Sequence, residues 1–166
     1  MLDPTLILYI TNPAEARRRA EQLAAEPVLG VDIETSSAHK YLGRRGAALD
    51  PYTAQVRLMQ VAALDGRVAL FDLHRVPLDA LTPICAVPWA TFNGNFEYRH
   101  LTRAGLTLPR LHDSMLLDRL VSHHLRNLAD ASKDVLGVDM DKAQQVSDWA
   151  APSCPDLKSN TPHSTR

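Results

Sequence analysis

Two acidic side chains, Asp32 and Glu34, stand one residue apart at the end of an apolar run at residues 28–33. Successive side chains of a β-strand point to opposite faces, so these two carboxylates would lie on the same face. Carboxylates side by side repel each other and are costly to bury, whereas a bound divalent cation stabilises both. Their oxygen atoms suit Mg²⁺ or Mn²⁺. The alternative interpretation is a strand end where both acids reach solvent.

A second group of polar side chains lies in the segment Asn93-Gly94-Asn95-Phe96-Glu97. The segment falls between an expected short strand and an expected helix, so Glu97 would lie in the first turn of that helix. A negative charge is favourable there because of the helix dipole. The alternative interpretation is an ordinary first-turn acid, with Asn93 or Asn95 as the capping residue. Taken alone, the segment does not select a function.

The elements that would position these acids follow from local patterns. Strands are expected at 6–10, 28–33, 56–64, 67–73 and 89–92, and helices after Asn12-Pro13 and at 78–86, 95–104, 114–123 and 125–136. Asp65-Gly66 predicts a hairpin between the third and fourth strands. The polar residues 36–55 are expected to form a long surface loop. An antiparallel hairpin beside further strands, with helices between, predicts an α/β fold with a mixed sheet.

Composition excludes several classes of protein. The chain has 166 residues, the size of one domain, and a net charge of −1, so any contact with nucleic acid must rest on a local patch. Cys85 and Cys154 lie far apart, which argues against a zinc site or a disulfide framework and favours a cytoplasmic location. The sequence shows no signal peptide and no apolar run of the ~20 residues that span a bilayer, so no membrane partner is expected.

Five segments, in order, resemble the DEDD superfamily of 3′→5′ exonucleases, which includes ribonuclease D and the proofreading domain of bacterial DNA polymerase I. VDIET resembles the first exonuclease motif, VRLMQVA the strand that follows it, and FNGNFEYRHL the second motif. HDSMLLDRLV and LRNLADASKDVLGVDMDKAQQVSDW are similar to the stretch leading to the third motif. The resemblance covers residues 28–149 and implies a ribonuclease H-like mixed sheet flanked by helices.

The resemblance also implies a mechanism and a set of site residues. Two divalent metal ions, Mg²⁺ or Mn²⁺, would be held by Asp32, Glu34 and Glu97 during hydrolysis of a phosphodiester at the 3′ end. The backbone near Thr35 would meet the terminal nucleotide, and Asn93 would help to fix the strand. The implied partner is single-stranded DNA or RNA with a free 3′ end, and a polymerase or other domain could lie on a separate chain.

Three features depart from the family pattern. Phe92 stands in place of a histidine, and Glu97 in place of an aspartate. The family also supplies a fourth carboxylate from a Y-x-x-x-D or H-x-x-x-x-D motif beyond the position of Trp149. Asp156 is the only acid there, and the residue four before it is Pro152. We therefore expect an exonuclease-like domain at residues 1–150, C-terminally truncated, whose activity is impaired.

The last residues, 151–166, are rich in proline and poor in apolar side chains, so we expect a disordered or frame-shifted tail. Residues 159–165 can be encoded so that a one-base shift reads Ile-Glu-Tyr-Ala-Ala-Leu-Asp, which contains the expected motif. Two other hypotheses stay open. The chain could be an inactive remnant of the same fold that binds nucleic acid or protein, or an unrelated α/β module.

Overall fold

The computed structural model describes residues 6–140. Trp149, Asp156 and the expected tail at 151–166 lie outside the described residues. The helices and strands are β1 (Ile7–Ile10), α1 (Pro13–Leu23), β2 (Leu29–Ser37), β3 (Ala54–Ala62), β4 (Val68–Asp72), the 3₁₀ helix η4 (Leu78–Ala86), β5 (Trp89–Thr91), α2 (Asn95–Arg103), β6 (Leu111–Asp113), α3 (Ser114–Ser122) and α4 (Leu128–Leu136). No helix within residues 6–140 is both long enough and apolar enough to cross a membrane.

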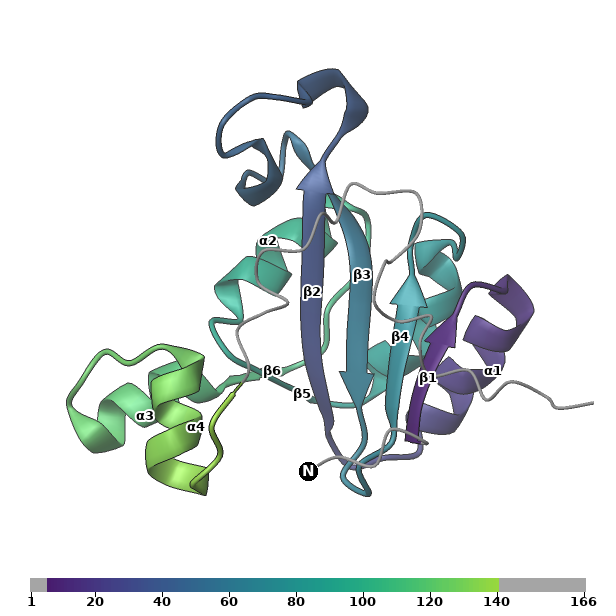
Figure 1. The fold of residues 1–166 in the computed structure, drawn as a ribbon. Coiled ribbons are helices and arrows are strands. Elements are labelled where there is room, and N and C mark those ends of the chain that lie inside the picture. Colours follow the sequence, from purple (N-terminus) through teal and green to yellow (C-terminus); the bar gives the residue numbers. More distant parts are fainter. Residues whose placement is uncertain (1–5, 141–166) are drawn as a thin grey trace, which may run out of the picture.

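The six strands form one mixed sheet in the order β1-β4-β3-β2-β5-β6 (Figure 1). Strand β3 pairs antiparallel with both β2 and β4, whereas β1 with β4, β2 with β5, and β5 with β6 pair parallel. The expected hairpin at Asp65-Gly66 is the turn between β3 and β4. Strand β2, which carries the first two acids, therefore lies inside the sheet with a neighbour on each side.

One face of the sheet carries the main hydrophobic core. Val31 and Ile33 of β2 point into it, together with Phe71 of β4, and all three are buried. Helices α1, η4 and α2 supply the other side of this core, for example through Ala20, and Figure 1 shows them behind the sheet. Since side chains of β2 alternate, Asp32, which lies between Val31 and Ile33, is directed to the opposite face of the strand.

Local signals in the sequence account for most helix ends. Asn12 caps α1 by accepting hydrogen bonds from the N–H groups of Ala14 and Glu15, and Pro13 is its first residue. Gly137 ends α4 with a φ of 68°, a left-handed conformation that glycine adopts without strain.

The expected loop at 36–55 is shorter in the structure. Strand β2 continues to Ser37 and β3 begins at Ala54, and the loop between them contains two short 3₁₀ turns, η2 (His39–Tyr41) and η3 (Ala47–Leu49). Polar residues reach into both strands because pairing between the strands satisfies the backbone whatever the side chain.

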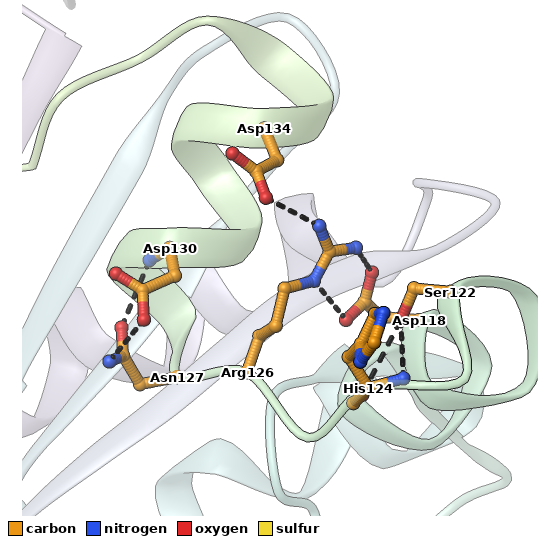
Figure 2. A network of polar contacts seen from close by, with 7 residues as sticks. All are labelled: Asp118, Ser122, His124, Arg126, Asn127, Asp130 and Asp134. Carbon is orange, nitrogen blue, oxygen red and sulfur yellow. Dashed lines mark hydrogen bonds and ion pairs between the residues drawn. The ribbon is translucent and has the colours of Figure 1, made fainter.

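Helices α3 and α4 form a hairpin that is held by Arg126, in the loop between them (Figure 2). Its Nε and Nη2 donate to Asp118 of α3, and its Nη1 donates to Asp134 of α4 at 2.7 Å. Asn127 caps α4 by accepting from the N–H of Asp130. This network fixes the angle of the hairpin, since Arg126 forms ion pairs with both helices at once.

Candidate active site

Asp32 and Glu34 lie on the same face of β2, as the alternation predicts. Across the sheet Asp32 pairs with Gln60 of β3, and Glu34 pairs with Leu58. The register shifts by one residue directly after Glu34, so a β-bulge ends the regular part of the strand there. Asp32 keeps contact with solvent and Glu34 is half-buried. Asp32 thus reaches solvent, as the alternative interpretation has it, whereas Glu34 does so only in part.

Glu97 lies in the first turn of α2 and is only 2% exposed. Its carboxyl group lies beside that of Asp32, close enough for each of the two groups to shift the pKa of the other. One oxygen of Glu97, Oε2, is buried without a hydrogen-bond partner. Glu97 is therefore a first-turn acid, as both interpretations require, and it is buried.

The pKa values of all three acids are raised, as expected for carboxyl groups that are partly desolvated and close to one another. Burial, and then the charge of Asp32, raises the pKa of Glu34 to about 7. Burial, followed by the charges of Asp32 and Asp113, raises the pKa of Glu97 to about 7 as well. The pKa of Asp32 is also raised, chiefly because protein atoms crowd out part of its hydration.

A positive charge near the three acids would relieve this repulsion. Within residues 6–140, none of the ion pairs joins Asp32, Glu34 or Glu97 to a basic side chain. The acids therefore resemble a set of cation ligands more than a structural salt bridge.

The acids offer the oxygen atoms that a metal ion requires, but their arrangement does not form a complete metal site. Asp32 and Glu97 lie side by side and offer hard oxygen ligands, including the unpaired Oε2 of Glu97. Among the described residues, however, no group of three His, Cys, Asp or Glu side chains is arranged to hold one ion. Glu34 is close enough to Asp32 for its pKa to respond but does not complete such a group.

The turn before α2 is held by Asp113, which comes from the end of β6. One oxygen of Asp113 accepts from the N–H of Asn93 at 3.1 Å, and the other accepts from the N–H of Gly94 at 2.9 Å. The same carboxylate caps α3 by accepting from Met115 at 3.0 Å and Leu116 at 3.3 Å. Asp113 thus ties the start of α3 to the start of α2, where Glu97 lies.

Glycine is required at position 94 by close packing. A Cβ atom there would lie 2.4 Å from Oγ1 of Thr91 and 3.7 Å from the carboxylate of Asp113. Gly94 also occupies the N-cap position of α2, where no side chain caps the helix. The capping role expected for Asn93 or Asn95 is therefore absent, and the carboxylate of Asp113 takes up the N–H groups of the turn instead.

The two expected substrate-binding residues, Thr35 and Asn93, lie in or next to the elements that carry the acids. Thr35 follows the bulge in β2, and its hydroxyl donates to the backbone oxygen of Ala48 at 2.6 Å, which ties the long loop to the strand. Asn93 has a φ of 66° and stays exposed. The positive φ turns the chain sharply between β5 and α2.

Two functional features escape reasoning from the sequence. The place of Asp113 before Ser114 is typical of a helix cap. Its second role is to accept hydrogen bonds from Asn93 and Gly94, 20 and 19 residues earlier, and this role follows only from the pairing of β5 with β6. His100, one turn after Glu97, is 4% exposed and stacks on Phe96 with 4.2 Å between ring centroids. Its Nδ1 bonds to the backbone oxygen of Phe96, and its Nε2 is buried without a partner.

The mixed six-stranded sheet with its flanking helices is a ribonuclease H-like fold. A model of the 3′-5′ exonuclease family matches residues 7–162. The chain therefore belongs to the 3′-5′ exonuclease family and is a 3′-5′ exonuclease domain of the DEDD type.

Relatives of known sequence or structure agree with this assignment. DNA polymerase I of Aquifex aeolicus is 24% identical over 147 residues, which cover 86% of this chain and 22% of that protein. The catalytic core of RRP6 from Trypanosoma brucei superimposes with a TM-score of 0.73 at 20% identity, over 90% of this chain and 40% of that one. RNase D from Escherichia coli gives a TM-score of 0.70 at 20% identity, over 88% and 37%. The chain thus spans less than half the length of each of these relatives.

Proposed function

We propose that this domain removes nucleotides from the 3′ end of single-stranded nucleic acid by a two-metal mechanism. The observation that carries the proposal is the approach of Asp32 to Glu97, a buried carboxyl whose Oε2 has no hydrogen-bond partner. A buried carboxyl beside a second acid and without a basic partner is costly in a metal-free protein, and ion binding offsets that cost. Asp32 would contact both ions, Glu34 the ion that carries the water, and Glu97 would complete the set.

When bound, the metal ions would supply an activated water and stabilise the charge on the phosphate and on the leaving 3′ oxygen. The residues of the chain place the substrate. The backbone near Thr35, at the bulge of β2, would meet the terminal nucleotide, and Asn93 would steady the strand from the turn before α2. Asp113 holds that turn and is a positioning residue.

Two proteins of the same fold support metal and nucleic acid as ligands. NrnC from Brucella melitensis, with a TM-score of 0.63 at 18% identity, was solved with bound Mg²⁺. RNase D from Trypanosoma brucei, with a TM-score of 0.70 at 14% identity, was solved in complex with the RNA U12. At these identities the likeness concerns the fold, so the choice of metal and of DNA or RNA for this chain is part of the proposal. A polymerase or other domain on a separate chain stays a prediction.

We further propose that the 166-residue polypeptide is a weak enzyme by itself. Its sequence supplies three of the four carboxylates that the family resemblance implies, and the codon reading of residues 159–165 offers a frame-shifted source for the fourth. Fewer ligands mean lower metal affinity, and a less well ordered pair of ions lowers turnover. The nucleotide sequence around residues 159–165 tests the frameshift directly, because codons that cannot yield Y-x-x-x-D in another frame would refute it.

The decisive experiment combines metal binding with cleavage. Calorimetric titration with Mn²⁺ is expected to show weak binding that Asp32→Ala abolishes. A 5′-labelled single-stranded oligonucleotide, as DNA and as RNA, is expected to shorten from its 3′ end with Mg²⁺, slowly and only with wild type. Glu21→Ala, on the outer face of α1, is the matched control and should leave both results unchanged. Equal trimming by wild type and Asp32→Ala would overturn the proposal.

A further inference from the structure

An open hollow of about 470 Å³ lies beside the outer face of α2. It is lined by Pro51, Tyr52, Tyr98, Arg99, Thr102 and Arg103, a set that we call the α2 surface. Three of these residues, Pro51, Tyr52 and Arg103, also line a neighbouring hollow of about 370 Å³. The two hollows are therefore parts of one depression between α2 and the segment that precedes β3.

The α2 surface combines exposed aromatic rings with free positive charge. Tyr52 is 72% exposed and Tyr98 is 54% exposed. The guanidinium of Arg103 lies over the ring of Tyr52, 5.4 Å from its centroid. Within residues 6–140, neither Arg99 nor Arg103 takes part in an ion pair. This pairing of exposed rings with free guanidinium groups is the composition of surfaces that bind single-stranded nucleic acid.

The neighbouring hollow contains a buried polar atom without a partner. His100 lines it, and the Nε2 of this 4% exposed side chain makes no hydrogen bond. Because Nδ1 bonds to the backbone oxygen of Phe96, it carries the hydrogen and Nε2 is left as an acceptor. Apolar side chains, Val56 and Leu78 among them, complete the wall. Polar side chains, Gln55 among them, also line the hollow, and a recess with mixed walls suits a nucleobase, which has apolar faces and polar edges.

The α2 surface lies on the same helix as Glu97, on the exposed side of that helix. Tyr98 and Arg99 follow Glu97 in the sequence, and Arg103 lies six residues beyond it. Six residues of an α-helix rise about 9 Å, which is one or two nucleotides of an extended strand. A strand with its 3′ end at Asp32 and Glu97 is therefore within reach of this surface by its next few nucleotides.

We propose that the α2 surface binds the single-stranded segment that leads to the 3′ end. Arg99 and Arg103 contact its phosphates, Tyr52 and Tyr98 stack on its bases, and His100 accepts a hydrogen bond from one base. This inference rests on the proposed function for the identity of its ligand, but it concerns affinity for the strand and is independent of cleavage.

Equilibrium binding of labelled oligonucleotides without catalysis tests the inference. The full chain, in EDTA, is titrated against single strands of two and of twelve nucleotides, and fluorescence anisotropy reports the affinity. Arg99→Ala/Arg103→Ala and Tyr52→Ala/Tyr98→Ala are each expected to weaken binding of the twelve-nucleotide strand by about tenfold or more. Both should weaken binding of the dinucleotide much less, because it can cover only a small part of this surface. The arginine variant should also flatten the salt dependence.

Control variants separate this surface from general charge. Arg17→Ala/Arg18→Ala removes the same charge from α1, where both arginines already pair with glutamates, and should leave the affinity unchanged. An equal loss in this control, or an equal loss for both oligonucleotide lengths, would overturn the inference. Asp32→Ala separates the two proposals, since it should abolish trimming while long strands still bind. If wild type itself does not trim, but binding of the twelve-nucleotide strand still depends on the α2 surface, the proposed function fails and this inference stands.

Discussion

Replacement of Glu97 by glutamine is expected to stabilise the metal-free protein in a strongly pH-dependent manner. Glu97 is 2% exposed, and its pKa is raised from 4.5 to about 7. A carboxyl whose pKa is higher in the folded state binds its proton more tightly there. Its contribution to stability is therefore fully present below pH 4.5 and is lost as the pH rises towards 7. Glutamine stays neutral throughout.

The size of the effect follows from the pKa of Glu97. A rise from 4.5 to about 7 corresponds, at 1.36 kcal/mol for each pKa unit, to about 3 kcal/mol, and we expect a gain on the order of 1–3 kcal/mol above pH 7. At pH 4.5 and below, Glu97→Gln and wild type should unfold at nearly the same denaturant concentration. The difference should grow between pH 4.5 and 7 and then level off.

Urea unfolding in EDTA at a series of pH values from 4.5 to 8.5 measures this difference. The matched control is Glu15→Gln on α1, because Arg18 and Arg19 hold the pKa of Glu15 below its usual value. Its stabilising contribution is present above the unfolded pKa of 4.5, so Glu15→Gln should be less stable than wild type by a nearly constant amount over this pH range, with the opposite sign to Glu97→Gln. A gain for Glu97→Gln that does not vary with pH, or a loss at pH 8.5, would refute the reasoning.

Three further predictions concern the site and the residues that hold it. Asp113→Ala and Asn12→Ala each remove a helix cap, so each should lower the free energy of unfolding by about 1–2 kcal/mol. Only Asp113→Ala should slow trimming, by tenfold or more, because it also frees the turn before α2. Equal trimming rates for the two variants would contradict this. Gly94→Ala should destabilise the fold by about 1–3 kcal/mol in urea unfolding, and a second change, Thr91→Ala, should restore part of the loss. Asp32→Asn should melt no lower than wild type in EDTA and should gain no stability from Mn²⁺; a clear drop in melting temperature would show that this acid is structural.

Local patterns in the sequence were sufficient to predict most of the helices and strands and the common face of Asp32 and Glu34. Alternation along β2 places Asp32 and Glu34 on one face, because backbone geometry alone sets the period of a strand. Asn12 before Pro13 determines where α1 begins, and Asp65-Gly66 determines the hairpin. Each of these signals acts within a few residues, so none depends on the rest of the fold.

Strand β6 and the second role of Asp113 could not be predicted in this way. The strand has three residues and carries no pattern of its own, and it forms because β5 offers a parallel edge beside it. Once Asp113 ends that strand, its carboxylate lies next to the N–H groups of Asn93 and Gly94. Such contacts depend on sheet order, which is a property of the whole domain.

The state of Glu97 shows most clearly what the tertiary structure decides. Its position in the first turn of α2 was predictable, but a first-turn acid is equally compatible with solvent. Only the packing of α2 on the sheet buries Glu97 and brings it to Asp32, 65 positions earlier in the chain. Desolvation and the neighbouring charge then raise its pKa, because both act through distance in space. The sequence by itself therefore determined which acids were present and which way two of them face, and the fold determined that they meet.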